Sequence, residues 1–308
     1  MHDNAPLVAV ILPTFNRRAL LPAAIRSVLG QTFRDWRLFV VNDGGEDVSD
    51  VVAGFGDPRI ECHDRPHLGK AAALNYGLGL VRSKYVAYMD DDDLVYPDHL
   101  AGLVSLAEEK KAEFVYSDTL LVVVGPDGKE RSRNVENDQD VTFDDLRFSN
   151  KINHKQILHT KRLADETGPY DERLRILIDY DYVRRLAART KPVHLRKVTG
   201  EHFLRLASDD RPGDIASISG LWVSDPAACG RSVAAVFEKD PAALADLYRD
   251  ALLDRIRIRR MEDSMENVRN ALERTRERLG TVETSLSYRV GRAFTAPLRM
   301  ISDILRSH

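Results

Sequence analysis

Cysteine is almost absent from this 308-residue sequence: only Cys62 and Cys229 occur, and they lie far apart. This usage excludes a disulfide framework and a cysteine metal site, and it is typical of a reducing compartment. Long hydrophobic runs are also missing, since the first apolar stretch, Leu7–Leu12, is too short to span a membrane. The start, Met1-His2-Asp3-Asn4, lacks the basic residues of a secretory signal. We therefore expect a cytoplasmic protein.

A surplus of charge of one sign is missing as well. The formal net charge is -3 and the pI is about 6.3, so nucleic acid is not expected as a partner. The composition is 43% hydrophobic and 30% charged. These values favour a globular domain of roughly 200 to 250 residues with an appendage, rather than a disordered chain.

The first part of the chain alternates between strand and helix patterns. Leu7–Leu12 is a continuous apolar run closed by Pro13, which is typical of a strand buried on both faces of a parallel sheet. The alternation predicts an α/β fold with a mostly parallel sheet flanked by helices, whose ligands bind beyond the carboxyl ends of the strands. Further strands are expected at 38–41, 59–63 and 85–89, and helices at 20–29 and 70–81.

Polar residues follow three of these strands. They are Thr14-Phe15-Asn16, Asn42-Asp43-Gly44 and Asp90–Asp93, so three loops are expected to meet in one crevice. Adjacent carboxylates repel one another unless a cation lies among them. Mg²⁺ and Mn²⁺ take oxygen ligands, commonly one or two carboxylates plus substrate phosphates. The aspartate run therefore predicts a divalent-metal site, and the alternative is a solvated acidic turn.

The pattern changes after residue 113. The apolar stretches Phe114–Tyr116 and Leu120–Val124 are separated from the polar residues that follow by Gly125-Pro126-Asp127-Gly128, a hairpin signal that predicts an antiparallel extension over 113–135. Short helices are expected at 162–167 and 179–188, and a short strand at Val193–Leu195. We place the α/β domain at residues 1–213.

The remaining residues are expected to be helical. We assign 214–260 to a helical region and 261–308 to a coiled-coil-like helix with a basic amphipathic tail. Two alternatives stay open for the helix: self-association through a coiled coil, or an amphipathic helix folded back on the domain. The heptad positions are Met261, Met265, Val268, Leu272, Thr275, Leu279, Val282 and Leu286.

The tail at 284–308 carries four arginines against Asp303, a local net charge of about +3. Apolar residues line its other side. Such a segment can lie on an anionic membrane surface, here the inner face of the membrane, or it can pack as an ordinary C-terminal helix.

Five short segments of the sequence follow one another in a characteristic order. They are Val10–Arg17, Ser27–Phe33, Val40–Gly44, Gly69–Gly77 and Met89–Asp93. In order and spacing they resemble glycosyltransferase family 2, inverting enzymes of the Rossmann-like GT-A fold that use nucleotide sugars, and the resemblance covers roughly residues 8–209. Asp171–Leu174 followed by Ile178-Asp179 resembles the segment with the family's catalytic base. One departure is that Ile178 stands where the family has an acidic residue.

The resemblance implies a nucleotide-sugar donor site, with a UDP-sugar as the commonest choice. In it, Phe15 would stack on the nucleobase and Asp43 would accept the ring N–H. The alternatives are core packing for Phe15 and turn formation for Asp43. Lys70 or Arg65 could reach phosphate oxygens, and Asp91 is expected to point away from the metal. The donor-site candidates are Pro13, Thr14, Phe15, Asn16, Asp43, Lys70, Asn75, Asp90 and Asp91.

The resemblance also implies Mn²⁺ or Mg²⁺ as cofactor. The leaving group is a nucleoside diphosphate, whose charge a divalent cation neutralises without proton transfer. The ligand candidates are Asp92, Asp90 and His202, and Asp93 is expected to orient the site through hydrogen bonds.

Asp179 is the candidate catalytic base. An ordinary aspartate titrates near 4 and is ionised at neutral pH, as a base that accepts the acceptor hydroxyl proton must be. The alternative is that Asp179 only caps the helix that follows. His154, His159 and Arg205 are further polar residues in this region, each a weak candidate by itself.

These features favour an enzyme that transfers a sugar to a glycan, lipid-linked or protein acceptor, in cell-surface polysaccharide synthesis. A second hypothesis is a catalytically silent scaffold subunit that binds sugar nucleotides. The absence of an acidic residue at Ile178 favours this hypothesis. A nucleotidyltransferase or metal-dependent phosphohydrolase uses similar carboxylates, but it needs no acceptor-side base such as Asp179.

Deleting residues 284–308 should weaken co-sedimentation of the protein with anionic liposomes, because the arginines and the apolar stripe are removed together. Neutral liposomes serve as the control. Equal sedimentation of the full-length and shortened chains would contradict the prediction that the tail binds a membrane.

Overall fold

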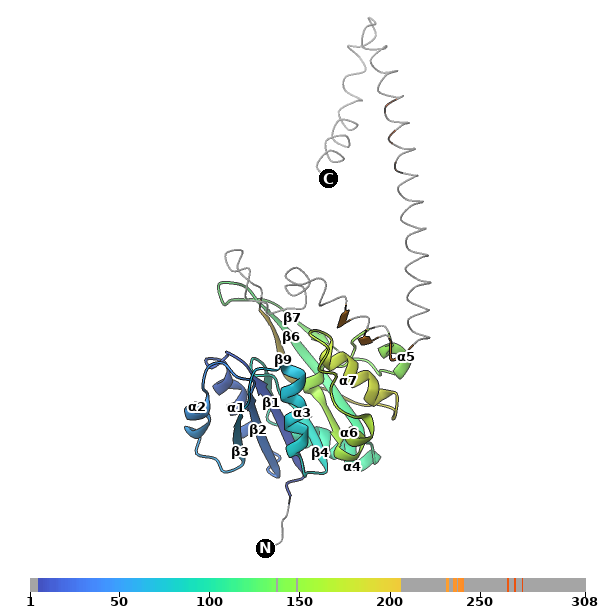
Figure 1. Cartoon of the computed structure of the whole chain (residues 1–308). Coiled ribbons are helices and arrows are strands. Elements are labelled where there is room, and N and C mark those ends of the chain that lie inside the picture. The colour runs from blue at the N-terminus through green and yellow to red at the C-terminus, as the bar shows by residue number, and fades with distance from the viewer. Residues whose placement is uncertain are drawn as a thin grey trace, which may run out of the picture. The chain divides into compact units, whose positions relative to one another are not determined.

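The first strands of the chain form the parallel part of one mixed sheet (Figure 1). The computed structural model describes residues 5–136, 138–147 and 149–205, the stretches 231–232, 235–236 and 238–240, and residues 265, 269 and 273. β1 (Val8–Thr14) lies between β2 (Trp36–Asn42) and β4 (Tyr85–Tyr88), and β3 (Ile60–Asp64) pairs with the other edge of β2. Every residue of β1 is buried, as expected for a strand covered on both faces.

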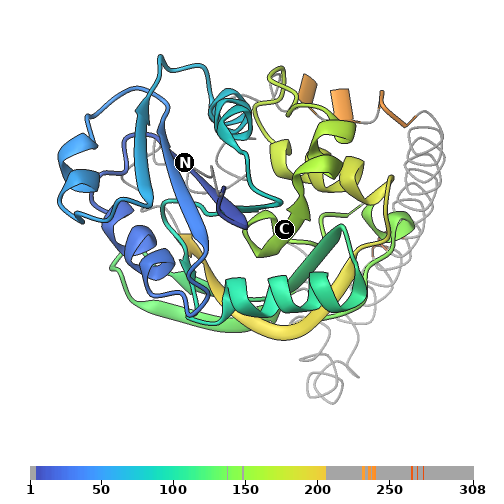
Figure 2. The ribbon, with the colours of Figure 1, turned by 90° about the horizontal axis from the view of Figure 1, so that it is seen from below.

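Helices cover both faces of this part of the sheet. Side chains alternate along β1, so Ala9 and Ile11 pack with α3 and α7, whereas its other apolar residues pack with α1 and α4. Figure 2 shows α3 and α7 on one side of the sheet and α1 and α4 on the other. Gly77 lets α3 approach, because a Cβ there would lie 2.5 Å from Cγ2 of Ile11. The bounds are α1 (Leu21–Leu29), α2 (Ser49–Ala53), α3 (Lys70–Leu80), α4 (His99–Lys110) and α7 (Ile178–Ala187).

The rest of the sheet mixes strand directions. β8 lies antiparallel between β4 and β6, and β6 pairs parallel with β9 and antiparallel with β7. The β6–β7 hairpin confirms the antiparallel extension predicted at 113–135. The strand order is β3-β2-β1-β4-β8-β6-β9-β5, with β7 beside β6. The bounds are β5 (Leu94–Val95), β6 (Phe114–Val124), β7 (Glu130–Glu136), β8 (Ile157–Thr160) and β9 (Val193–Arg205).

The strand predicted at Val193–Leu195 is much longer than expected. β9 has 13 residues and continues to Arg205. The polar residues Arg196 and Lys197 interrupt the apolar pattern of the strand. Both are exposed, and the register between β9 and β6 is irregular there. Gly200 also belongs to the strand, where a Cβ would lie 2.6 Å from Nε2 of Gln156. The prediction was therefore wrong about where this strand ends.

The predicted helices at 20–29, 70–81, 162–167 and 179–188 are present as α1, α3, α6 (Lys161–Thr167) and α7. The sequence-based prediction lacks the helices α2, α4 and α5 (Phe143–Leu146) and the strands β5 and β8. β8 is only four residues long, and it follows η1 (His154–Gln156), a 3-10 turn whose polar side chains are all buried. Buried polar residues hide the apolar pattern on which such a prediction depends.

The first compact unit runs from Met1 to Ala243, beyond the predicted domain end at residue 213. Its last described residues pack on the domain. Val236 is 1% exposed in the core beside α7, and Lys239 forms ion pairs with Asp171 and Asp181.

The second unit runs from Leu244 to His308 and is described only at Met265, Arg269 and Glu273, which are helical. The rest of the predicted heptad, the tail at 284–308 and most of the region 214–260 lie outside the described residues. Within the described part of the chain, every helix is too short or too polar to span a bilayer.

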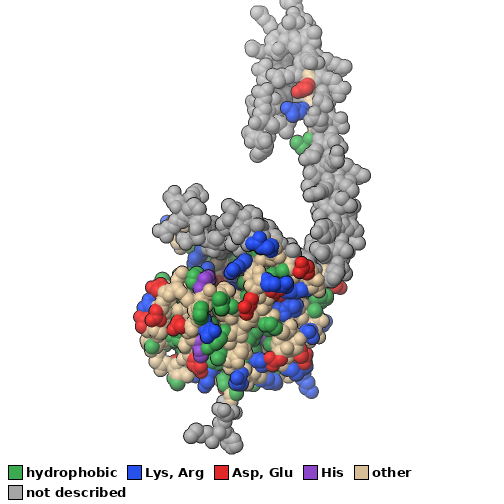
Figure 3. Space-filling model, viewed as in Figure 1, with side chains coloured by type: hydrophobic (Ala, Val, Ile, Leu, Met, Phe, Trp, Pro, Cys, Tyr) green, Lys and Arg blue, Asp and Glu red, His purple; other side chains and the backbone are tan. Residues whose placement is uncertain are grey.

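Acidic and basic side chains are mixed over the described part of the surface seen in Figure 3. On α6, Lys161 pairs with Asp165 and Arg162 with Glu166, each one helical turn apart. Exposed pairs of this kind contribute little stability, about 0 to 1 kcal/mol each.

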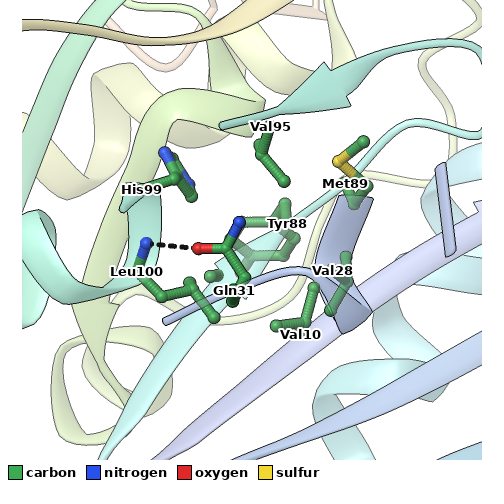
Figure 4. Close-up of a pocket in the computed structure, with 9 residues that line it drawn as sticks. Val10, Val28, Gln31, Tyr88, Met89, Val95, His99 and Leu100 are labelled. Atoms are coloured by element: carbon green, nitrogen blue, oxygen red, sulfur yellow. Dashed lines mark hydrogen bonds between the residues drawn. The ribbon is translucent and has the colours of Figure 1, made fainter. Parts of the chain in front are cut away.

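A small cavity of about 10 Å³ lies between α1, β1, β4 and the start of α4 (Figure 4). On its wall, Oε1 of Gln31 accepts a hydrogen bond from the backbone N–H of Leu100 (2.9 Å). His99, also on the wall, has Nδ1 2.7 Å from Oγ1 of Thr199. Burial lowers the pKa of His99 to about 4, so its imidazole is neutral at pH 7.

Mild acid should destabilise the fold through buried histidines. Burial lowers the pKa of His99, His154 and His159 to about 4 in the folded chain, whereas histidine in an unfolded chain titrates near 6.5. The stabilising contribution is therefore fully present above about pH 6.5 and is lost as the pH falls toward about 4. We expect His99→Gln to reduce the loss of unfolding free energy between about pH 7 and about pH 5, by on the order of 1 kcal/mol.

Urea denaturation of both proteins at the two pH values measures this effect. The same pH dependence in wild type and variant would contradict the role of His99.

Candidate active site

Three loops meet beyond the carboxyl ends of β1, β2 and β4, which confirms the predicted convergence. The backbone N–H of Asp43, after β2, donates to the carbonyl of Thr14 at the end of β1 (2.9 Å). Oγ1 of Thr14 in turn donates to Oδ2 of Asp91 after β4 (2.7 Å). Thr14 thus holds the first and third loops together.

Two carboxylates of the aspartate run are partly exposed, Asp90 and Asp92, with side chains 23% and 18% exposed. Nζ of Lys70 lies 2.8 Å from Oδ1 of Asp90. Oδ2 of Asp92 lies 2.7 Å from Nη1 of Arg17 and 3.6 Å from Nη1 of Arg205. These are the two carboxylates that a ligand can reach.

The other two carboxylates, Asp91 and Asp93, are buried. Asp91 accepts hydrogen bonds from Thr14 and from Nη1 of Arg17 (3.0 Å), and burial raises its pKa. Asp93 pairs with Lys155 and accepts a hydrogen bond from the backbone N–H of Phe203 (2.8 Å). Both side chains therefore face into the protein, as predicted for Asp91.

Four cations of the chain thus lie on four carboxylates. Burial raises the pKa of Asp90, but Lys70 and Lys155 more than offset this, so its pKa lies well below the ordinary value. Repulsion within the aspartate run is therefore relieved by the protein itself. The run does not require a metal ion for its charge balance, and the case for a metal rests on ligand chemistry instead.

The short turn η1 ties the aspartate run to β9. Lys155 of η1 pairs with Asp93, which also binds the backbone of Phe203 in β9. Asn153, just before η1, has Nδ2 3.1 Å from Nδ1 of His202, also in β9. Burial lowers the pKa of Lys155 to about 8. These contacts fix where the end of β9 lies relative to the run.

Asp179 is the second residue of α7 and does not cap it. The cap residue is Leu177, whose left-handed backbone (φ 60°) is strained for a non-glycine residue, and no side chain caps the helix. The capping alternative for Asp179 is therefore wrong. Burial lowers the pKa of Lys70, but Asp90 and then Asp179 outweigh it and raise the pKa above the ordinary value. Asp179 thus lies within electrostatic range of the aspartate run.

Phe15 lies at the surface rather than in the core. It is 39% exposed and stacks on His67, with ring centroids 4.1 Å apart and planes 14° apart. The core-packing alternative for Phe15 is therefore wrong. Leu68, next in the same loop, is 62% exposed. The pair of rings forms an apolar surface beside the three loops.

Asp43 is buried and holds the loop that carries His67. Its Oδ1 accepts from the backbone N–H of Leu68 (3.0 Å), and its Oδ2 accepts from that of Gly69 (2.9 Å) and lies 2.8 Å from Nδ1 of His67. Glycine is favoured at position 69, because its φ of +102° is a backbone conformation that other residues rarely adopt. Asp43 thus supports the stacked rings, and its contact with a nucleobase stays a prediction.

The remaining donor-site candidates contact other residues of the protein. Pro13 is buried in β1, and Oδ1 of Asn16 accepts from the backbone N–H of Glu46 (3.0 Å). Asn75 binds the backbone of Tyr170 through both amide atoms, at 2.7 and 3.0 Å. The guanidinium of Arg65 lies over the ring of Tyr76. A role of these residues in donor binding stays a prediction.

The metal-ligand candidates fit a site that a substrate completes. Within the described residues, no group of three or more His, Cys, Asp or Glu side chains is arranged to hold a metal ion. Asp90 and Asp92 offer partly exposed carboxylate oxygens, and Mg²⁺ and Mn²⁺ often bind one or two carboxylates plus phosphates. Burial lowers the pKa of His202 to about 4, which keeps it in the neutral form that binds metals.

Sequence reasoning missed three residues of the site: Arg17, Lys155 and His67. Arg17 directly follows the loop Thr14–Asn16, so its place after β1 was a usable signal. Lys155 stands among residues that the structure buries, and a lysine is almost never fully buried without a partner. The stacking of His67 on Phe15 had no signal in the sequence, because the residues belong to different loops.

The sequence matches the model of the family described as glycosyl transferase family 2 over residues 9–168, more than half of the chain. A PGL/p-HBAD biosynthesis glycosyltransferase of Mycobacterium bovis is 30% identical over 184 residues, covering 58% of this chain and 68% of that protein. An uncharacterized glycosyltransferase of Rickettsia typhi is 30% identical over 190 residues, covering 58% of each chain.

Solved structures share the fold at low identity. TarS 1–349 of S. aureus aligns with a TM-score of 0.52 and 16% identity, over 64% of this chain and 60% of that chain, and TarS 1–349 is also known in complex with UDP-GlcNAc. The mannosyltransferase PcManGT from Pyrobaculum calidifontis, in complex with GDP-Man and Mn²⁺, aligns with a TM-score of 0.51 and 16% identity, over 82% of this chain and 81% of PcManGT.

The mixed α/β fold is therefore that of GT-A glycosyltransferases, as predicted. With its sequence matched over the strands that carry the aspartate run, the chain belongs to glycosyl transferase family 2 and is a glycosyltransferase.

Proposed function

We propose that this glycosyltransferase is inverting and metal-dependent, and that it moves a sugar from a nucleotide-diphosphate donor, a UDP-sugar, to a hydroxyl group of its acceptor. One observation carries the proposal. Asp90 of the aspartate run and Asp179 of α7 act on the same lysine, Lys70, although they come from distant parts of the sequence. A donor-side acidic site and an acceptor-side carboxylate thus share one region.

The stacked rings of Phe15 and His67 support a nucleobase next to the aspartate run. An exposed aromatic ring offers a face on which a base can stack. The choice of a UDP-sugar is supported by the likeness to TarS, which is known with UDP-GlcNAc, whereas PcManGT is known with GDP-Man.

Asp92, with Asp90, is the proposed ligand set for Mn²⁺ or Mg²⁺, and His202 is a further candidate. A bound divalent cation supplies Lewis-acid neutralisation of the leaving diphosphate. Arg17 and Lys70 lie against these carboxylates and hold them in place. The partly exposed oxygens of Asp90 and Asp92 leave room for phosphate oxygens at the same place.

Asp179 is the proposed base that accepts the proton of the acceptor hydroxyl. None of the described residues donates a hydrogen bond to its carboxylate, so its oxygens are available to a hydroxyl group. Attack of that hydroxyl from the face opposite the diphosphate inverts the anomeric carbon. Asp179 lies in the first turn of α7, directly after the left-handed residue Leu177 and Ile178.

We further propose a glycan, lipid-linked or protein acceptor used in cell-surface polysaccharide synthesis, at the cytoplasmic face of the membrane. The relative from Mycobacterium bovis is named for PGL/p-HBAD biosynthesis, which supports an acceptor of glycolipid type. Self-association or membrane contact through residues 261–308 belongs to this proposal.

A catalytically silent subunit that binds sugar nucleotides is the second candidate. It is favoured by Ile178, which is 8% exposed and cannot replace the acidic residue of the family pattern. Turnover of a donor would exclude this candidate, whereas donor binding without turnover would support it.

Asp92→Asn should lower metal-dependent transfer by at least about 100-fold, because a carboxylate that faces the metal and the diphosphate is lost. The fold should be kept, since partly exposed ion pairs contribute little stability. Release of the nucleoside diphosphate, measured with Mn²⁺ and with chelator, reports the effect. Asp50→Asn, at an exposed carboxylate paired with Arg18, is the matched control. Full activity of Asp92→Asn would contradict the assignment of Asp92 as a metal ligand.

Asp179→Asn should lower kcat by about 100- to 10,000-fold, because the base for the acceptor hydroxyl is removed, while donor binding is kept. Single-turnover transfer and calorimetric donor binding separate the two quantities. Asp165→Asn, on the exposed side of α6, is the control. Transfer at the wild-type rate by Asp179→Asn would show that another residue is the base.

A further inference from the structure

The backbone that leads into α7 has no cap from its own side chains. Leu177 stands at the cap position in a left-handed conformation (φ 60°), and no side chain caps the helix. A strained conformation of this kind persists only where the surrounding structure enforces it. Asp179 lies in the first turn of the same helix, so its position depends on the contacts that hold this turn.

Ser232 supplies such a contact from a distant part of the sequence. It is 1% exposed, and its Oγ accepts a hydrogen bond from the backbone N–H of Arg175 (3.0 Å) and a longer one from that of Ile176 (3.5 Å). Ser232 and Arg175 are 57 positions apart in the sequence. The two N–H groups stand directly before Leu177, so the hydroxyl of Ser232 holds the turn that leads to Asp179.

Lys239 joins the loop before α7 to the helix itself. Its Nζ lies 2.9 Å from Oδ2 of Asp171 in the loop and 2.7 Å from Oδ1 of Asp181 in the first turn of α7. The side chain of Asp181 is only 2% exposed, so this ion pair is screened less than a surface pair. Asp171 and Asp181 stand before and after Asp179 in the sequence, and one ammonium group therefore ties both ends of this stretch together.

The residues around Ser232 and Lys239 are anchored on α7. Val236 is 1% exposed in the core that α7 shares with α3, and Nη2 of Arg184 on α7 lies 3.0 Å from Oδ2 of Asp240. Figure 2 shows these residues in orange beside the yellow-green helices. We call the described residues 231–232, 235–236 and 238–240 the clamp.

We infer that the clamp positions Asp179 for catalysis, with Ser232 and Lys239 as positioning residues that act through Asp179. The inference rests on the proposed function, which makes Asp179 the base. A base must lie within hydrogen-bond reach of the hydroxyl whose proton it accepts, and a misplacement of about 1 Å can lower the rate about 100-fold. The clamp therefore sets the rate of transfer, whereas donor binding depends on the loops after β1, β2 and β4.

Steady-state release of UDP from UDP-GlcNAc and of GDP from GDP-Man, by the full chain with Mn²⁺, tests the clamp. Water replaces the acceptor hydroxyl in this assay: it attacks the anomeric carbon, gives its proton to Asp179, and the nucleoside diphosphate leaves. With the donor that the wild type turns over, Lys239→Met and Ser232→Ala should each lower kcat about 10-fold or more and leave the donor KM within about 2-fold. Lys239→Arg should recover part of the loss, because it keeps the charge between the two carboxylates.

Lys161→Met is the matched control. The side chain of Lys161 is 25% exposed and that of Lys239 is 27% exposed, but Lys161 pairs with Asp165 on α6. This variant should turn over the donor as the wild type does. Thermal melting shows which variants are folded, and Lys239→Met carries the test if Ser232→Ala does not fold.

A double variant shows whether the clamp acts through Asp179. In the Asp179→Asn background, Lys239→Met should lower kcat by less than about 2-fold, because a base that is already missing cannot be misplaced. A role in the stability of the fold alone would lower kcat by the same factor in both backgrounds.

Wild-type kcat in both Lys239→Met and Ser232→Ala would overturn the clamp and leave the proposed function standing. An equal loss in the wild-type and Asp179→Asn backgrounds would also overturn it. Turnover by Asp179→Asn at the wild-type rate would overturn the assignment of the base, and the clamp with it.

Discussion

The ion pairs on Asp90–Asp93 are the constraint on which the site depends. Their cations come from four separate elements: Arg17 after β1, Lys70 at the start of α3, Lys155 in η1 and Arg205 at the end of β9. A buried carboxylate without a partner costs several kcal/mol. The buried Asp91 and Asp93 can therefore take their positions only when Arg17 and Lys155 are in place, which couples the geometry of the site to the assembly of the loop after β1 with η1.

The long strand β9 joins β6 to the segment just after the aspartate run. It pairs with β6 along most of its length and with the short strand β5 just after the aspartate run. The end of β9 therefore lies against the aspartate run. The backbone N–H of Phe203 donates to Asp93, and Arg205 donates to the carbonyl of Asp92. The parallel strands alone would leave this side of the run open. The mixed part of the sheet closes it with a rigid strand rather than a loop.

Rigid elements also position the groups on the acceptor side. Asp179 lies in the first turn of α7, whose apolar residues pack in the same core as α3. α3 in turn carries Lys70 and approaches β1 closely through Gly77. The proposed base and the proposed donor site are therefore positioned relative to each other by packed helices. Such a scaffold suits a displacement in which a donor and an acceptor must be aligned.

The sequence by itself determined the parts that depend on local pattern. These include the parallel strands, the helices α1, α3, α6 and α7, and the place of the aspartate run at a strand end, because apolar periodicity and strand ends are visible within short windows. Tertiary structure decided which cation meets each carboxylate and where β9 ends. Lys155 and Asp93 are 62 positions apart, and Phe203 and Asp93 are 110 apart. Pairings over such separations arise from the packing of whole elements, so no local pattern encodes them.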